Sequence, residues 1–163
     1  MTDVIMFCLV TGILSTVALD IWVTLVEKVI GLPATNWGMV GRWLCGISRG
    51  QWVLSNSGPS TPSAAEKTLG WAFHYVVGTS YSVLIVLVWG VEFIHAPTVM
   101  PVVMVGVVIS TLAGLMILMP GLGAGFMGRK LPNQGVMFAY VVVAHVVYAL
   151  ALYGVAIRFS TGA

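Results

Sequence analysis

Four long apolar stretches constrain this chain more than any other feature of its sequence. A helix needs roughly 20 mostly apolar residues to cross a hydrocarbon core about 30 Å thick. Residues 4–26, 69–93, 99–119 and 136–157 meet that requirement. Lipid cannot satisfy exposed backbone groups, so segments this uniformly apolar are expected to be α-helices rather than barrel strands. The sequence predicts a single all-α domain over residues 1–163, with four transmembrane helices in an antiparallel bundle.

The composition indicates that lipid, rather than water, covers most of the surface. Hydrophobic residues make up 59% of the chain and charged residues 7%, whereas a soluble domain is about 25% charged. The net charge of +2 is too small for a nucleic-acid-binding surface. The two cysteines form no CxxC pair, so neither a disulfide framework nor a metal site is expected. Membrane lipids are therefore the expected partners, without nucleic acid.

The first connection, residues 27–68, divides into two parts. Residues 36–54 combine tryptophans with arginines, which suits the headgroup layer and predicts a short interfacial helix. Residues 55–63, SNSGPSTPS, are expected to form a polar loop. Ser63 and Glu66 then have the spacing of a capping box, which marks the start of the second span.

The basic residues predict how the chain is oriented. Six of the seven Lys and Arg residues lie in the first and third connections, and only Arg158 lies on the other side. Cytoplasmic connections carry the excess of Lys and Arg. Residues 27–68 and 120–135 are therefore expected in the cytoplasm, with both termini outside. The first apolar run lacks the basic flank of a signal peptide and is expected to be retained.

Asp20 is the only acidic residue deep within a predicted span. An intramembrane carboxylate costs roughly 2.5–3.5 kcal/mol on insertion scales, so Asp20 is expected to face the bundle and to have a partner. His74 lies at similar depth on an oppositely directed helix. The two side chains could handle a proton, bind a polar group or form a purely structural pair.

Three further residues are candidates for a binding or proton-handling site. His145 lies near the middle of the fourth span, with Tyr148 on the same face one turn later. Arg42 either comes close to Asp20 and His74 or contacts lipid phosphate. His74 and His145 would permit bis-imidazole haem ligation, but their depths differ. No cofactor is therefore expected.

Small residues recur at steps of four within the spans. This spacing lets helix backbones approach closely, and packing is its expected role. With Asp20 and His74 as members of the same series, the residues are Gly12, Thr16, Asp20 and Thr24, then Gly70, His74, Gly78 and Ser82, then Gly106, Ser110 and Gly114. A glycine-rich run at residues 119–128 follows the third span. It formally contains G-x-G-x-x-G but follows an apolar helix instead of a strand, so it is expected to end or bend that helix.

Short motifs along nearly the whole chain resemble one bacterial family. These are Gly41-Arg42-Trp43, Gly70-Trp71 with His74-Tyr75, Pro120-Gly121-Leu122-Gly123 with Gly125-Phe126, and His145 with Leu152-Tyr153-Gly154. In this order they are similar to the small membrane proteins of domain of unknown function 2938. The resemblance implies four spans in the bacterial cytoplasmic (inner) membrane, and it implies no substrate.

Three functions follow as hypotheses. The favoured one is a small-solute or proton-coupled binding or transport protein, with Asp20, His74 and Arg42 in a polar site near the cytoplasmic side. Four spans are few for a complete transport path, so a homo-oligomer or a partner membrane subunit is expected. The second is a membrane-embedded enzyme acting on a lipid-soluble substrate, but no nucleophile motif or metal cluster supports it. The third is a structural or accessory subunit of a membrane complex.

Overall fold

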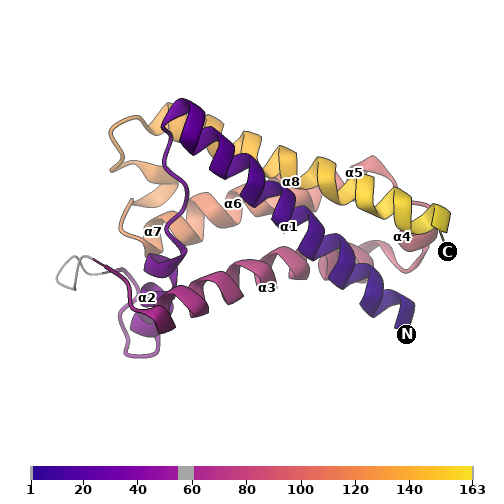
Figure 1. Ribbon diagram of the computed structural model, residues 1–163, viewed down its shortest axis with the longest axis horizontal. Coiled ribbons are helices and arrows are strands. Elements are labelled where there is room, and N and C mark those ends of the chain that lie inside the picture. Colours follow the sequence, from indigo (N-terminus) through magenta and orange to yellow (C-terminus); the bar gives the residue numbers. More distant parts are fainter. Residues whose placement is uncertain (1, 55–60, 163) are drawn as a thin grey trace. The chain divides into compact units, whose positions relative to one another are not determined.

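The computed structural model describes residues 2–54 and 61–162, and Figure 1 labels its elements along the chain. Residues 55–60 of the predicted polar loop lie outside the described residues. The described elements are all helices. Four helical stretches are long and apolar enough to cross a membrane: α1 (Thr2–Ile30), α3 (Ala64–Trp89), Val99–Gly121, and α8 (Gln134–Gly162). The predicted class, all-α with four candidate membrane spans, is confirmed.

The third candidate span changes its helical geometry along its length. It consists of α5 (Val99–Val102), η1 (Val103–Ile109), α6 (Ser110–Ala113), η2 (Gly114–Leu118) and α7 (Met119–Gly121). In η1 and η2 the backbone follows the wider π pattern, in which each hydrogen bond spans five residues. Apolar periodicity does not report this widening, and the sequence predicted a regular helix here. π-Helical turns are often found beside functional sites.

Packing groups the chain into two compact units. Unit 1 comprises Met1–Ala34, Tyr75–Thr111 and Val142–Ala163, and unit 2 comprises Thr35–His74 and Leu112–Val141. Helices α3 and α8 and the third candidate span each contribute residues to both units. The single domain over residues 1–163 stays a prediction.

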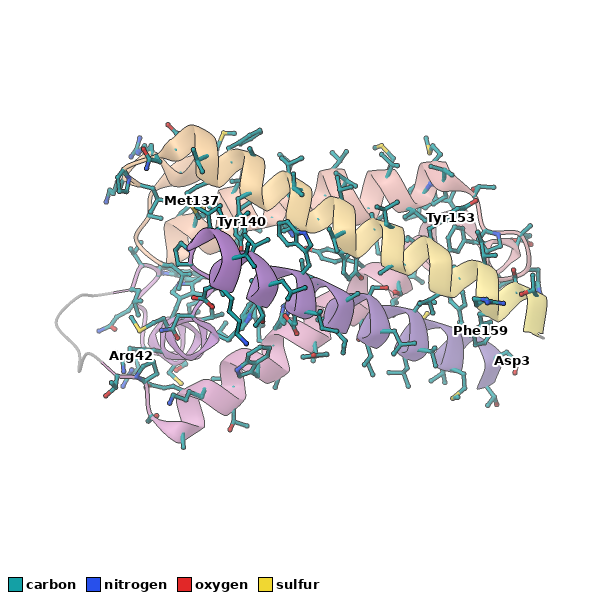
Figure 2. All side chains as sticks on the ribbon, turned by 45° about the horizontal axis from the view of Figure 1, so that its top comes forward. Asp3, Arg42, Met137, Tyr140, Tyr153 and Phe159 are labelled. Carbon is teal, nitrogen blue, oxygen red and sulfur yellow. The ribbon has the colours of Figure 1, made fainter. Side chains whose placement is uncertain are left out.

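An apolar core fills unit 1. Phe7 is fully buried and makes edge-to-face contacts with two other aromatic rings. Its ring centroid lies 6.1 Å from that of Phe93 and 5.2 Å from that of Phe159, which Figure 2 labels on α8. Such pairs stabilise a core by about 0.5–1.5 kcal/mol beyond the area they bury. Core residues from α3, η1 and α8 surround this cluster: Ile85, Val105 and Leu152.

Small residues bring α1 and α3 together in unit 1, as their four-residue spacing predicted. A Cβ atom on Gly12 would lie 2.5 Å from the Thr79 Cα, and one on Gly78 would overlap the Thr16 hydroxyl. A larger side chain at Gly12 would therefore push the two helices apart, and one at Gly78 would first displace the Thr16 side chain. Helix packing is confirmed as a role of these glycines.

Unit 2 holds α2 (Trp37–Ile47) against the first turns of α3. Asn36 caps α2, because its side chain accepts a hydrogen bond from the Met39 N–H at 3.2 Å. A Cβ atom on Gly41 would overlap the carbonyl oxygen of Glu66, and one on Gly70 would overlap that of Trp37. The sequence predicted a helix in this connection, and the structure confirms it.

The start of α3 is built by the predicted capping box. The Ser63 N–H donates to Glu66 Oε2 at 2.7 Å, and the Glu66 N–H donates to Ser63 Oγ at 3.2 Å. The far end differs from the prediction, which extended the apolar segment to residue 93. Helix α3 ends at Trp89, because Gly90 adopts the left-handed conformation (φ +84°) that terminates many helices. The short helix α4 (Glu92–His95) follows.

Candidate functional site

Asp20 on α1 accepts a hydrogen bond from Tyr75 on α3, within unit 1. The Tyr75 hydroxyl lies 2.9 Å from Asp20 Oδ2, and Asp20 is half-buried. Hydrogen bonds to ionised groups are roughly twice as strong as neutral ones, so this bond offsets part of the cost of a carboxylate inside a span. Sequence reasoning required a partner for Asp20 but did not consider Tyr75, although Tyr75 follows His74 directly in the same motif.

Tyr148 and His145 link α8 to other helices of unit 1. The Tyr148 hydroxyl is buried and donates to the Gly78 carbonyl oxygen at 2.6 Å. His145 Nδ1 lies 3.2 Å from Thr111 Oγ1, immediately after the widened turns of η1. The two residues were predicted on one face of the helix, and they reach two different elements, α3 and α6.

Buried hydroxyl groups give unit 1 a polar interior. Four of them bond a carbonyl oxygen four residues earlier on their own helix: Thr11, Ser15, Thr16 and Ser110, at 2.5–2.8 Å. Ser82 differs, because its buried Oγ meets no described group at good hydrogen-bond geometry and has the nearby Tyr148 hydroxyl as a polar neighbour. A buried polar group left unsatisfied typically costs about 1–3 kcal/mol.

Several of these polar groups lie at the middle of their helices. Thr16 is central in α1, and Tyr148 is central in α8. Gly78 and Thr111 are near the centres of the second and third candidate spans. If the four helices cross a bilayer, these groups are near its midplane. We call the following residues the midspan layer: Thr16, Gly78, Ser82, Thr111, His145 and Tyr148.

In unit 2, His74 stacks on Trp37. The ring centroids are 3.8 Å apart and the planes differ by 21°, while Trp71 meets the His74 ring edge-on at 5.9 Å. The stack joins α2 to α3 and buries His74 to 8% exposure. Asp20 belongs to unit 1, so the pairing of Asp20 with His74 stays a prediction.

Arg42 forms an ion pair with Glu66 in unit 2. Its Nε and Nη2 atoms lie 2.9 and 3.1 Å from the two Glu66 oxygens, and Nη2 also donates to the Thr61 carbonyl at 2.9 Å. Figure 2 labels Arg42 on α2. The hydrogen bond with Glu66 raises the pKa of Arg42. The geometry is the two-pronged fork that arginine makes with carboxylates. Sequence reasoning considered Asp20, His74 and lipid phosphate as its neighbours, and it missed Glu66.

Metal and haem binding were the two kinds of cofactor site considered from the sequence. No group of three or more His, Cys, Asp or Glu side chains there could hold a metal ion. His74 and His145 belong to different units, so haem ligation by this pair stays untested.

Comparison with known proteins gives a family but no function. No curated protein and no solved structure matches the chain. The model of one family, described as protein of unknown function (DUF2938), matches residues 9–158. This range contains the Asp20–Tyr75 pair, the midspan layer and all of unit 2. The family resemblance indicated by the short motifs is thereby confirmed, and this chain with its four candidate membrane spans belongs to the DUF2938 family of proteins of unknown function.

Proposed function

We propose that this protein binds or transports a small solute with proton coupling, and that Asp20 carries the proton. The observation that supports this most is the hydrogen bond from Tyr75 to Asp20 inside two candidate spans. Ionisable residues within spans are rare, because they are expensive to insert, and they usually mark ion, proton or substrate pathways. A tyrosine hydroxyl can donate to a carboxylate and accept from a carboxylic acid, so the pair can exist in both protonation states.

The midspan layer extends the polar groups beyond this pair. Thr16 lies one helical turn from Asp20 on α1, and Gly78 lies about one turn from Tyr75 on α3. Tyr148 donates to Gly78, and His145 follows on the same helix. An imidazole ring can both accept and donate a proton, so His145 is a suitable second proton carrier. Arg42 and His74 have well-packed partners in unit 2, and we assign them to holding α2 against α3.

A structural role for the polar residues is the competing function. The observation that favours it is that four buried hydroxyls bond carbonyls of their own helices. Such groups need no solute to be satisfied. Under this function the Asp20–Tyr75 bond would only fix the packing of α1 on α3.

Proton flux into proteoliposomes that contain a pH-sensitive dye would test the proposal. The wild type should dissipate an imposed pH gradient faster than protein-free vesicles, and Asp20→Asn should fall to the protein-free rate with an unchanged melting temperature. Asp3→Asn is the matched control, because Asp3 is exposed in the first turn of the same helix (Figure 2). If the Asp20→Asn variant keeps the wild-type proton flux, Asp20 does not carry the proton. If the wild type shows no proton flux and the Asp20→Asn variant has a lower melting temperature, the structural role is favoured.

We place the protein in the bacterial cytoplasmic membrane, with residues 27–68 and 120–135 in the cytoplasm and both termini outside. The support is the excess of Lys and Arg in these two connections. Cys45 on α2 is a free, half-exposed thiol. A membrane-impermeant thiol reagent should label it only after the cells are permeabilised. Rapid labelling in intact cells would invert the orientation.

We also expect the working form to be a homo-oligomer or a complex with another membrane subunit, because four spans are few for a transport path. Native mass spectrometry of the detergent-released protein reports its assembly directly. A monomer that carries full proton flux would contradict this expectation.

A further inference from the structure

A cleft of about 330 Å³ lies in unit 2, where the third candidate span ends. Its walls combine apolar side chains with two cations. Val53, Met116 and Phe126 supply apolar surface, and Arg129 and Lys130 supply positive charge. None of the other features described above uses this cleft.

The glycine-rich loop holds both cations at the cleft. The Lys130 N–H donates to the Ala124 carbonyl oxygen at 3.0 Å, which closes the loop on itself. Gly125 adopts φ +78°, and a Cβ atom there would lie 3.0 Å from Arg129 Cγ and 3.2 Å from Lys130 Cγ. The stems of both cations therefore pack over a position that only glycine fills without displacing them.

Unit 2 offers these cations little negative charge of its own. Glu66 is its only acidic residue in the sequence, and Arg42 engages both oxygens of that carboxylate. Arg129 and Lys130 are both exposed. The arrangement is suited to an anion that comes from outside the unit.

The apolar and cationic lining residues also follow one another along the chain as the acyl chain and headgroup do in a lipid. Met116 belongs to η2, within the candidate span, whereas Arg129 and Lys130 lie in the connection after it. Apolar surface at hydrocarbon depth is thus followed by cations beyond the span end. Basic pockets at the ends of transmembrane helices bind the headgroups of anionic lipids. A nucleotide would be a poorer occupant, because the loop follows an apolar helix and not a strand.

We propose that this cleft binds an anionic phospholipid, with the phosphate at Arg129 and Lys130 and an acyl chain against Met116 and Phe126. This site lies entirely in unit 2 and does not depend on Asp20 or on the proposed transport.

Lipid-dependent stabilisation of the purified protein in detergent tests the site. Phosphatidylglycerol should raise the melting temperature in a saturable way, while phosphatidylcholine and inorganic phosphate should not. The Arg129→Gln/Lys130→Gln variant should bind phosphatidylglycerol about 25-fold more weakly, since each basic side chain near an anionic surface contributes roughly fivefold. The charge-matched control is Lys28→Gln/Arg49→Gln, which removes two exposed cations outside the cleft and should retain wild-type affinity.

Three results would overturn the proposal. Equal stabilisation by inorganic phosphate would mean a free-anion site, and equal stabilisation by phosphatidylcholine would mean that charge is not recognised. An equal loss in the control variant would mean diffuse attraction to the whole basic surface. The Phe126→Gln variant keeps both cations and should weaken phosphatidylglycerol binding through the acyl chain alone. Unchanged binding in this variant would contradict the apolar part of the site.

Discussion

The polar interior of unit 1 lies within its candidate spans, whereas the charged residues of unit 2 lie on α2, at the start of α3 and in loops. In unit 1 the acidic residues outnumber the basic ones by four to two, and in unit 2 the basic residues outnumber the acidic one by five to one. The interior polar groups of unit 1 are mostly hydroxyls and one carboxylate, each able to bond a neighbouring helix or its own backbone. A hydroxyl can be satisfied within apolar surroundings, but a cation is cheaper where headgroups or water reach it.

The two units can also be compared by what the glycines at their helix contacts face. In unit 2, Gly41 of α2 and Gly70 of α3 face backbone carbonyls, which cannot move aside without shifting a helix. In unit 1, Gly12 also faces backbone, the Thr79 Cα atom, but Gly78 faces the hydroxyl of Thr16, which can rotate away if it gives up its hydrogen bond to the Gly12 carbonyl oxygen. Helix contacts made through backbone should therefore tolerate substitution less than contacts made through a side chain.

The largest expected effect comes from Gly70→Ala in unit 2. The added methyl group would overlap the Trp37 carbonyl oxygen, and overpacking of this kind costs roughly 1–3 kcal/mol or more. Gly78→Ala should cost less, because Thr16 can turn away. Thermal unfolding in detergent would compare these variants with Gly154→Ala on α8, where nothing lies within 4 Å of the added methyl. If Gly70→Ala had the same melting temperature as the Gly154→Ala control, the protein would not have the close backbone contact between α2 and α3.

A moderate effect is expected from Tyr148→Phe in unit 1. The change removes the 2.6 Å hydrogen bond to the Gly78 carbonyl and should lower the free energy of unfolding by roughly 1 kcal/mol. The same unfolding measurement on Tyr153→Phe is the control. Tyr153, labelled in Figure 2, is on the same helix, and its hydroxyl makes no hydrogen bond within the described part of the chain. If Tyr148→Phe and Tyr153→Phe lose the same free energy of unfolding, the hydrogen bond between α8 and α3 does not account for the loss.

The smallest expected effect, of opposite sign, comes from Ser82→Ala. Its hydroxyl makes no hydrogen bond of good geometry among the described residues and has the nearby Tyr148 hydroxyl beside it, so removing it should leave stability unchanged or raise it by up to about 1 kcal/mol. Ser110→Ala, which deletes a 2.7 Å bond to Gly106, should instead lose a few tenths of a kcal/mol or more. A larger loss in Ser82→Ala than in Ser110→Ala would show that the Ser82 hydroxyl has a partner in the working protein. That result would strengthen a binding role for the midspan layer.

Local sequence signals predicted several parts of the fold correctly. The capping box of Ser63 and Glu66 and the helix in the first connection depend on neighbours a few residues apart, so both could be predicted from spacing. The π-helical turns of the third span could not, because they change the hydrogen-bond register without changing the apolar pattern. The second span ends earlier than expected, since Gly90 terminates α3 while apolar residues continue beyond it.

The sequence by itself determined that this is an all-α chain with four candidate membrane spans. The length of an apolar segment and its lack of charged residues can be read directly from consecutive residues. In lipid, such a segment has to satisfy its own backbone hydrogen bonds, which favours a helix. Only the tertiary structure decided which polar side chains meet. Asp20 bonds Tyr75 across 55 positions, and Arg42 pairs with Glu66 across 24. Such partners depend on how helices rotate and approach one another, and the residue pattern along one helix does not contain that information.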